Sequence, residues 1–252
     1  MCAKPNLDDA KACLARAQRH YRELNELAGP DKLWGFTEGQ DGDTGEWFNC
    51  LHLDRGRLVA AKPVLADSAT NAISALDHVA AAIAKANGHD RLRWLHYPLG
   101  LTDDDFNEAC GKTKDALGDA MLGVLANARQ AHPVERHHIE AARQISNDGK
   151  HWGFRPADGK AAAIQLVVPG NGHKVFDLPA DAFAAADAHE FYRGQERLPK
   201  GDYLIVVNLL VSGLDDGLPD AANSILECSF RFVRGVIDAV AAAGAGEDDH
   251  TA

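Results

Sequence analysis

The hydrophobic residues of the first 150 positions recur mostly at steps of three and four, which is the spacing of amphipathic helices. Residues 7–28 follow this pattern and stop at Gly29 and Pro30, so they predict a first helix. A second helix is predicted from Pro63 to Ala86, closed by Asn87 and Gly88. Further helices are predicted over 103–109, 114–129 and 133–146, with a last one after Pro219.

Two other regions have strand patterns instead. Residues 33–58 carry five glycines around a turn-rich tip and predict a β-hairpin. Beyond Trp152, the apolar runs 161–168, 173–178 and 203–211 predict a small sheet with at least two buried strands, whereas 181–194 is interpreted as a short helix.

These elements predict an α+β fold with three consecutive parts. Residues 1–152 would form an N-terminal helical bundle with a β-hairpin insertion. Residues 153–244 would form a small C-terminal β-sheet with a long terminal helix, packed on the first part as one compact unit. Residues 245–252 would be a disordered tail.

Composition narrows the classes of protein. The chain has 252 residues, 46% of them hydrophobic, as in a globular protein, and its formal net charge is −11. That charge argues against a broad phosphate-binding surface but leaves room for a local basic cleft. Five scattered cysteines without ligand spacing, no apolar leader and no run of about 18 apolar residues predict a cytoplasmic protein with reduced thiols and no membrane partner.

The common catalytic motifs are missing from the sequence. It has no GxxxxGK[ST] loop, no GxGxxG after a strand, no GxSxG elbow, no HExxH and no EF-hand loop. No nucleotide cofactor is therefore indicated by a motif, and the sequence leaves the cofactor and the metal requirement open.

Polar residues gather on one face of the predicted helix 63–86. Asn71, Ser74 and His78 stand at i, i+3 and i+7, and Asp77 lies on their flank. They are either the solvated side of an amphipathic helix or a second, polar interface. The second interpretation is supported by their neighbours, which are alanines and not the Glu and Lys of a usual solvated face.

A second polar group ends the predicted helix 133–146. Asn147, Asp148, Lys150 and His151 follow one another closely. Asn-Asp-Gly is typical helix-ending chemistry, and Lys and His favour the negative end of a helix dipole. The alternative is that an acid-base group, a cation and an amide bind a phosphate or orient a substrate.

His138 falls on the apolar side of helix 133–146. A histidine there is usually a core residue with a satisfied hydrogen bond. Alternatively it is a metal ligand or a base pointing into the bundle, together with His20, His78 or His151.

The segments NAISALDH, YPLG and ISNDGKH, in that order, resemble a widespread group of uncharacterised bacterial proteins with N-x-x-SALDH and N-x-x-KH motifs. That group is remotely similar to HEPN helical domains, many of which are ribonucleases or RNA-binding partners in defence and toxin systems. The resemblance implies His78 as the histidine, with Asn71 and Asp77 as polar positions. The arginine of the HEPN motif corresponds to Ile73 here, and Arg136 or Arg143 would have to replace it.

Three functions follow from these observations. The first is a HEPN-like domain that binds or cleaves RNA, with His78, Asp77 and His151 catalytic and with Asn71, Ser74, Asn147, Asp148 and Lys150 binding substrate. The second is a small-molecule enzyme, such as a metal-dependent hydrolase, with a metal held by His78, Asp77, His138 or His151. The third is a non-catalytic module that forms a homodimer or binds a partner through the Asn71 face.

Overall fold

A computed structural model describes residues 4–90, 92–151, 153–155, 157–168, 172–179 and 181–245 of the chain. It is an α+β fold, as predicted, and it divides into two compact units. The helical unit comprises 1–22, 63–155 and 213–252, and the sheet unit comprises 23–62 and 156–212. The units therefore interleave along the chain and differ from the consecutive parts 1–152 and 153–244 that the sequence predicted. Of the predicted tail, 246–252 lies outside the described residues, and Ala245 ends the last helix.

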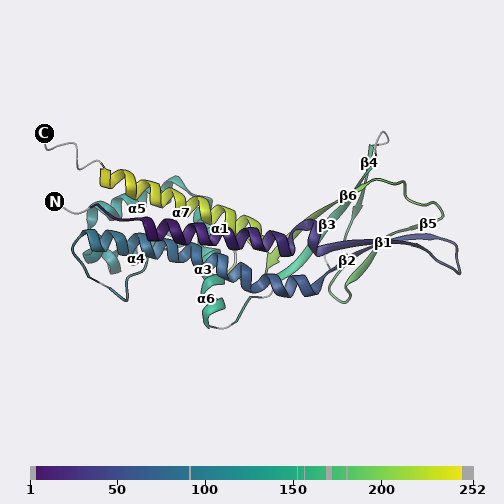
Figure 1. The fold of residues 1–252 in the computed structure, drawn as a ribbon, viewed down its shortest axis with the longest axis horizontal. Helices are drawn as coiled ribbons and strands as arrows, with labels where there is room; N and C mark the ends of the chain where they lie inside the picture. Colours follow the sequence, from purple (N-terminus) through teal and green to yellow (C-terminus); the bar gives the residue numbers. More distant parts are fainter. Residues whose placement is uncertain are drawn as a thin grey trace. The chain divides into compact units, whose positions relative to one another are not determined.

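Long helices build the helical unit (Figure 1). Their bounds are α1 (Asp8–Ala28), α3 (Arg55–Ala86), α4 (Asp103–Leu117), α5 (Asp119–Ala131), α6 (Glu135–His151) and α7 (Ala222–Ala245). The first residues of α3 and the last of α1 belong to the sheet unit. Tyr21 of α1 meets Phe230 of α7 edge-on, with ring centroids 5.7 Å apart, and the Ser68 hydroxyl of α3 donates to the carbonyl of Ala17 at 2.9 Å.

Helix α3 starts earlier than the sequence predicted. Pro63 was expected to open it, but the helix begins at Arg55 and Pro63 lies inside it. Asp54 provides the start, since its carboxylate accepts from the Arg57 N–H at 3.0 Å and its carbonyl accepts from Leu58. The sequence placed the start at Pro63 because a proline lacks the N–H that an interior position uses and is usual in a first turn. The helix in fact starts eight residues earlier, at Arg55.

Helix α6 also differs from its prediction, because it continues through Asn147, Asp148 and Gly149 to His151. Gly149 is a point of close approach, where an added Cβ would lie 3.1 Å from the Ala66 Cβ. The residue with positive φ is Gly153, at 110°, and its N–H bonds to the carbonyl of Asp148. Residues 110–113, predicted to separate two helices, are helical and belong to α4. The break between α4 and α5 is instead at Gly118, which has a φ of 76°.

The sheet unit holds two three-stranded antiparallel sheets, together with the short helix α2 (Pro30–Leu33). In one sheet, β2 (Trp47–Leu53) lies between β1 (Trp34–Gln40) and β5 (Ala188–Gly194). In the other, β3 (Ala157–Val168) lies between β4 (Gly172–Asp177) and β6 (Asp202–Val211). The predicted hairpin is confirmed as β1 and β2.

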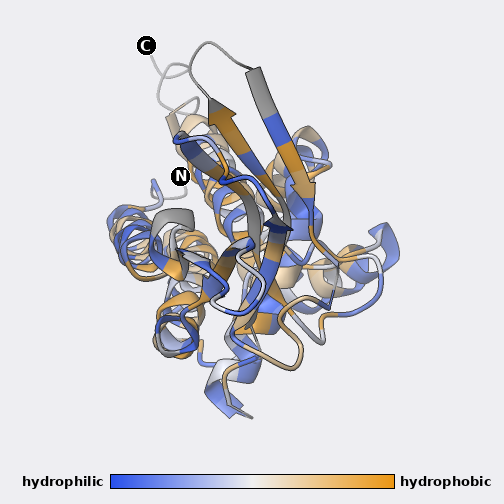
Figure 2. Ribbon diagram, turned by 90° about the vertical axis from the view of Figure 1, so that its right-hand side faces the viewer, coloured by the Kyte–Doolittle hydropathy of each residue, from blue (hydrophilic) through white to orange (hydrophobic). Residues whose placement is uncertain are grey.

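Aromatic side chains join the two sheets. Phe36 of β1 stacks on Tyr203 of β6 at 4.6 Å between centroids, and Phe191 of β5 meets Phe176 of β4 edge-on at 5.3 Å. Figure 2 shows the hydrophobic, orange segments of these strands. The short helix predicted over 181–194 was wrong, because residues 188–194 pair with β2 and tertiary packing overrides their alanine-rich context.

No helix in the described part of the chain is long and apolar enough to cross a membrane. Cys13, Cys50, Cys110 and Cys228 are free thiols, and Cys2 lies outside the described residues.

Candidate functional site

The polar face predicted on α3 borders α1. Asn71 and Ser74 are half-buried and His78 is exposed. The contact of Ser68 with Ala17 and a pocket shared by His78 and Asp9 place the two helices antiparallel. Asn71 also uses its side-chain amide locally, because it donates to the carbonyl of Asp67 at 2.7 Å.

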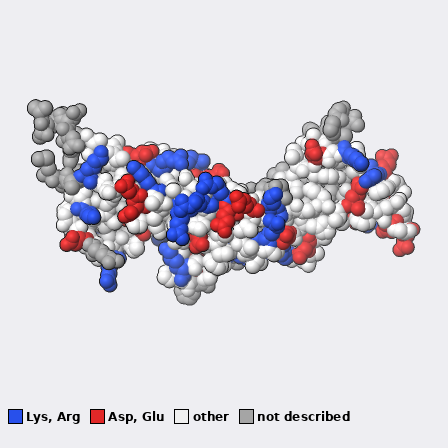
Figure 3. Space-filling view, viewed as in Figure 1, with Lys and Arg blue, Asp and Glu red and all other residues white. Residues whose placement is uncertain are grey.

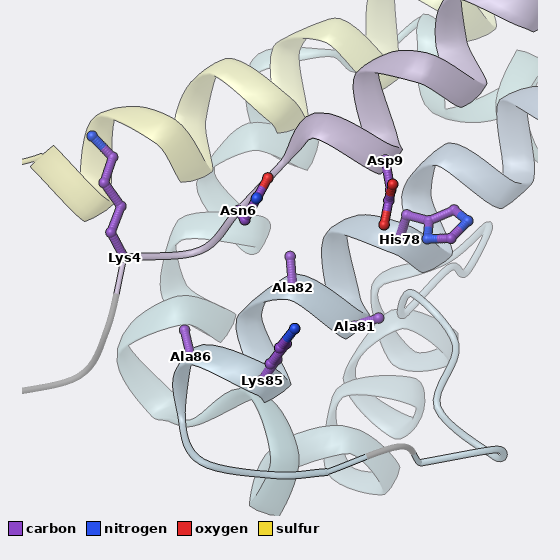
Figure 4. A pocket seen from close by; sticks show the side chains of 8 residues that line it. All are labelled: Lys4, Asn6, Asp9, His78, Ala81, Ala82, Lys85 and Ala86. Carbon is purple, nitrogen blue, oxygen red and sulfur yellow. The ribbon is translucent and has the colours of Figure 1, made fainter.

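His78 lines a pocket of about 340 Å³ together with Lys4, Asn6, Asp9 and Lys85; Ala81, Ala82 and Ala86 complete the wall. Figure 4 shows His78 and Asp9 at one end and Lys85 nearer the middle. The ammonium of Lys4 points towards α7 and away from the pocket in the same view. Asn6 accepts from the Asp8 N–H at 2.9 Å, so it caps α1 at the edge of the pocket.

Asp77 has a structural partner on the other flank of α3. Its Oδ1 accepts from the backbone N–H of Tyr97 at 3.0 Å, and its Oδ2 lies 3.2 Å from Nδ1 of His96. A carboxylate accepts, so His96 donates through Nδ1. The carboxylate predicted to act beside His78 therefore anchors the YPLG segment to α3.

The second predicted polar group, at the end of α6, packs against a different part of α3 from the part that carries His78. The Thr70 hydroxyl bonds to Ser146 at 3.1 Å, and Gly149 faces Ala66. His78 is twelve residues from Ala66, which is about 18 Å along a helix axis. The pocket at His78 therefore does not include the end of α6.

Within that helix end, Asn147, Lys150 and His151 are exposed, and Asp148 is paired with Arg155. The ion pair with Arg155 gives Asp148 a structural role, while the other three side chains remain available to a ligand.

The proposed replacements for the missing arginine are both occupied. Ile73 is buried in the core. Arg136 lies 3.6 Å from the Asp103 carboxylate, and Arg143 donates through Nε to Glu140 at 2.8 Å. Neither guanidinium lines the pocket at His78.

Arg16 of α1 is a cation that the sequence reasoning did not assign to this site. It stands seven residues after Asp9, so both lie on one face of α1, and Asp9 lines the pocket. The stretch 10–22 contains Lys11, Arg16, Arg19 and Arg22 and no acidic residue. All four are exposed and none forms an ion pair within the part of the chain that the structure describes. Figure 3 shows blue side chains gathered over the middle of α1.

Lys85 and Trp94 were also missed. Lys85 lines a second pocket of about 300 Å³ with His89, Asp90, Leu92 and Leu95, formed by α3 and the segment after it. Trp94 belongs to this segment and is 55% exposed. A tryptophan next to Arg93 in the polar segment after the helix was the signal in the sequence. Only the fold shows that Lys85 is shared with the pocket at His78.

The thiol of Cys13, four residues after Asp9 on α1, is not activated. Burial raises the pKa of Cys13, and the charge of Asp9 raises it further. Cys13 therefore stays protonated near neutral pH and is a poor nucleophile.

Among the described residues, no group of three His, Cys, Asp or Glu side chains is placed to hold a metal ion. His138 is satisfied by protein partners, namely the carbonyl of Val134 at 2.9 Å and the hydroxyl of Ser224 at 3.1 Å.

Comparisons with protein-family models, with curated proteins and with solved structures each found no match.

Proposed function

We propose that this protein binds single-stranded RNA through the helical unit, along the α3 face that runs from Asn71 to Lys85 and the segment that carries Trp94. The observation that carries the proposal is the position of Lys85, which lines both the pocket of His78 and the pocket formed with the segment of Trp94. Lys85 therefore lies between the pocket of His78 and the segment that carries the exposed Trp94.

Charge supports this choice despite the overall acidity. Binding to nucleic acid depends on neutralising phosphates locally, and Lys85 with the unpaired cations of α1 supplies that charge. Arg16 would contact a phosphate beyond the pocket, because it lies on the α1 face that borders α3. His78 would hydrogen-bond to a phosphate oxygen at the pocket.

The exposed ring of Trp94 supports a single strand over a duplex. Unpaired bases stack on aromatic side chains, and each such contact contributes about 1–3 kcal/mol by alanine substitution. Bases in a duplex are already stacked on one another and do not offer these faces.

The proposal is for binding and not for cleavage. A HEPN-like cleavage would need the arginine that the motif places five residues before the histidine, and this position is the buried Ile73. The arginines of α6 are engaged by Asp103 and Glu140. A homodimer through the same face stays a prediction, which light scattering of the purified protein would measure.

The test is fluorescence anisotropy with a labelled single-stranded RNA of about twelve nucleotides, a length within the range of such sites. Lys85→Glu should weaken binding about tenfold or more, because it reverses a charge at the phosphate contact. Lys112→Glu is the matched control, since Lys112 is an exposed lysine of α4 paired with Glu108 and has no part in the site.

Trp94→Ala should weaken binding by a similar amount, and RNA should quench tryptophan fluorescence in the wild type more than in this variant. Equal losses in Lys85→Glu and Lys112→Glu would show that binding is only nonspecific attraction. No binding at low salt would exclude the proposed function.

A further inference from the structure

A serine and a histidine on the facing helices α6 and α7 form a pair that the RNA site does not use. Ser224 is the third residue of α7, and His138 is in the first turns of α6. The Oγ of Ser224 lies 3.1 Å from Nε2 of His138, and both residues are half-buried. This distance is within the range at which a base activates a nucleophilic serine.

The second nitrogen of His138 defines the direction of that hydrogen bond. Nδ1 lies 2.9 Å from the carbonyl oxygen of Val134. A carbonyl oxygen only accepts, so Nδ1 carries the proton of the neutral ring. Nε2 then has its lone pair free, and the Ser224 hydroxyl donates to it. This is the tautomer in which an imidazole can take a proton from serine, and the carbonyl of Val134 holds the ring in orientation.

The start of α7 adds donors beside the same hydroxyl. The Ile225 N–H bonds to the carbonyl of Ala221 at 2.9 Å, so the N–H groups of Ala222, Asn223 and Ser224 precede the i to i−4 bonds of the helix. Such donors stabilise the negative oxygen that develops when a carbonyl carbon is attacked.

Charge around the pair limits the substrate. The segment 213–221 before α7 contains Asp215, Asp216 and Asp220, all exposed, and no Lys or Arg. Arg155 reaches the carbonyl of Gly213, but it is itself paired with Asp148. Arg231, seven residues after Ser224 on α7, is paired with Glu135. With both arginines paired, the acidic segment disfavours anions, so the surface is unlike the proposed RNA site and fits a neutral or cationic molecule.

We propose that Ser224 and His138 form a nucleophile and base pair that hydrolyses small neutral or cationic acyl esters. Ser224 Oγ attacks the ester carbon and its proton passes to His138 Nε2. The bond to the alcohol oxygen breaks, and the alcohol leaves with the proton from Nε2. Water, deprotonated by the same nitrogen, then cleaves the acyl-serine and releases the carboxylic acid, which restores the hydroxyl.

A fluorophosphonate probe with a fluorescent tag tests the pair directly. Ser224 Oγ should displace fluoride at phosphorus, the proton should pass to His138, and mass spectrometry should locate the adduct on Ser224. Labelling should disappear in Ser224→Ala and fall at least tenfold in His138→Gln. Ser229→Ala is the control on the same helix and should label as the wild type does, because Ser229 is fully buried and donates to the carbonyl of Ile225.

Turnover is measured with p-nitrophenyl acetate, which is neutral, and with a succinylated p-nitrophenol of negative charge. The neutral ester should be hydrolysed at least tenfold faster, and Ser224→Ala should abolish the difference. Circular dichroism of each variant separates loss of reaction from loss of fold. A folded wild type that neither takes the probe nor hydrolyses the neutral ester would overturn the proposal, as would a probe adduct that persists in Ser224→Ala.

Discussion

The carboxylate of Asp77 shows how a residue in a polar motif can act through the fold. It accepts from the N–H of Tyr97 and pairs with His96, and Tyr97 is buried with 4% of its surface exposed. The ring of Tyr97 approaches Phe232 of α7 at 6.5 Å between centroids. Asp77 therefore ties the segment after α3 into the core of the helical unit.

Asp77→Ala should lower the free energy of unfolding by about 1–3 kcal/mol, because it leaves the buried N–H of Tyr97 without an acceptor. Urea unfolding followed by circular dichroism measures this change. Asp67→Ala is the matched control, an exposed aspartate of the same helix that should change stability by less than about 0.5 kcal/mol. Equal effects of the two substitutions would contradict the role of Asp77.

His78→Ala should weaken binding of the labelled RNA by about fivefold with the fold unchanged, since one hydrogen bond to a phosphate contributes about 1 kcal/mol. Anisotropy titrations measure the loss, and circular dichroism verifies the fold. His137→Ala is the control, because His137 is a half-buried histidine of α6 that bonds to the carbonyl of Pro133. If both variants bind RNA as the wild type does, His78 does not contact it.

At the scale of the elements, one arginine holds the start of α4. Arg129 of α5 is 5% exposed and donates through Nη1 to Asp103 at 2.6 Å, and its guanidinium lies 4.9 Å from the centre of the Phe106 ring. That hydrogen bond lowers the pKa of Asp103, and the hydroxyl of Thr102 in the capping box lowers the pKa of Asp105. Both carboxylates are thus more acidic in the folded chain than in the unfolded one.

Stability from these two aspartates should be present above the ordinary aspartate pKa of about 3.9 and should be lost as the pH falls through their lower folded values. Asp103→Asn should therefore lower the free energy of unfolding at pH 7. Its difference from the wild type should shrink when both proteins are unfolded with urea at a pH below about 3. A difference that is the same at both pH values would rule out the Arg129 pair as its cause.

Two glycines in the helical unit should respond in opposite directions to alanine. Gly153 has a φ of 110°, so Gly153→Ala should cost about 1–3 kcal/mol of stability. Gly111 lies inside α4 with open space around a would-be Cβ, so Gly111→Ala should stabilise by about 0.5–1 kcal/mol. Thermal unfolding of both variants checks the pair, and a stabilising Gly153→Ala would show that the α6 end does not need this glycine.

The helices and the hairpin could be predicted from spacing because their apolar stripes are local properties of the sequence. The errors occurred where a distant contact decides the structure. Gly149 was interpreted as a helix end, whereas in the structure it lies within α6 and packs closely against Ala66. Residues 188–194 form a strand because they pair with β2. For the site, the face of Asn71, Ser74 and His78 could be found from the sequence. The proximity of Asp9 to His78, and the second pocket that Lys85 lines, depend on packing that spacing does not encode.

For the whole molecule, the proposed binding of RNA would have to overcome a net charge of −11. If about four cations, among them Lys85 and Arg16, each replace a counterion of the strand, log K should fall with log salt at a slope of about −3. Anisotropy titrations between about 50 and 300 mM KCl measure the slope. Lys85→Glu should reduce the magnitude of this slope by the share of about one phosphate contact. A slope near zero would exclude phosphate as the ligand.

The interleaving of the two units sets an order of events during translation. The hairpin of β1 and β2 ends at Leu53, but its partner β5 starts at Ala188. At typical synthesis rates, the roughly 135 intervening residues take about 7–27 s to emerge from the ribosome, and α7 follows later still. During that interval the edge of β2 that later pairs with β5 has no partner strand, so its backbone N–H and C=O groups are open to pairing with another chain.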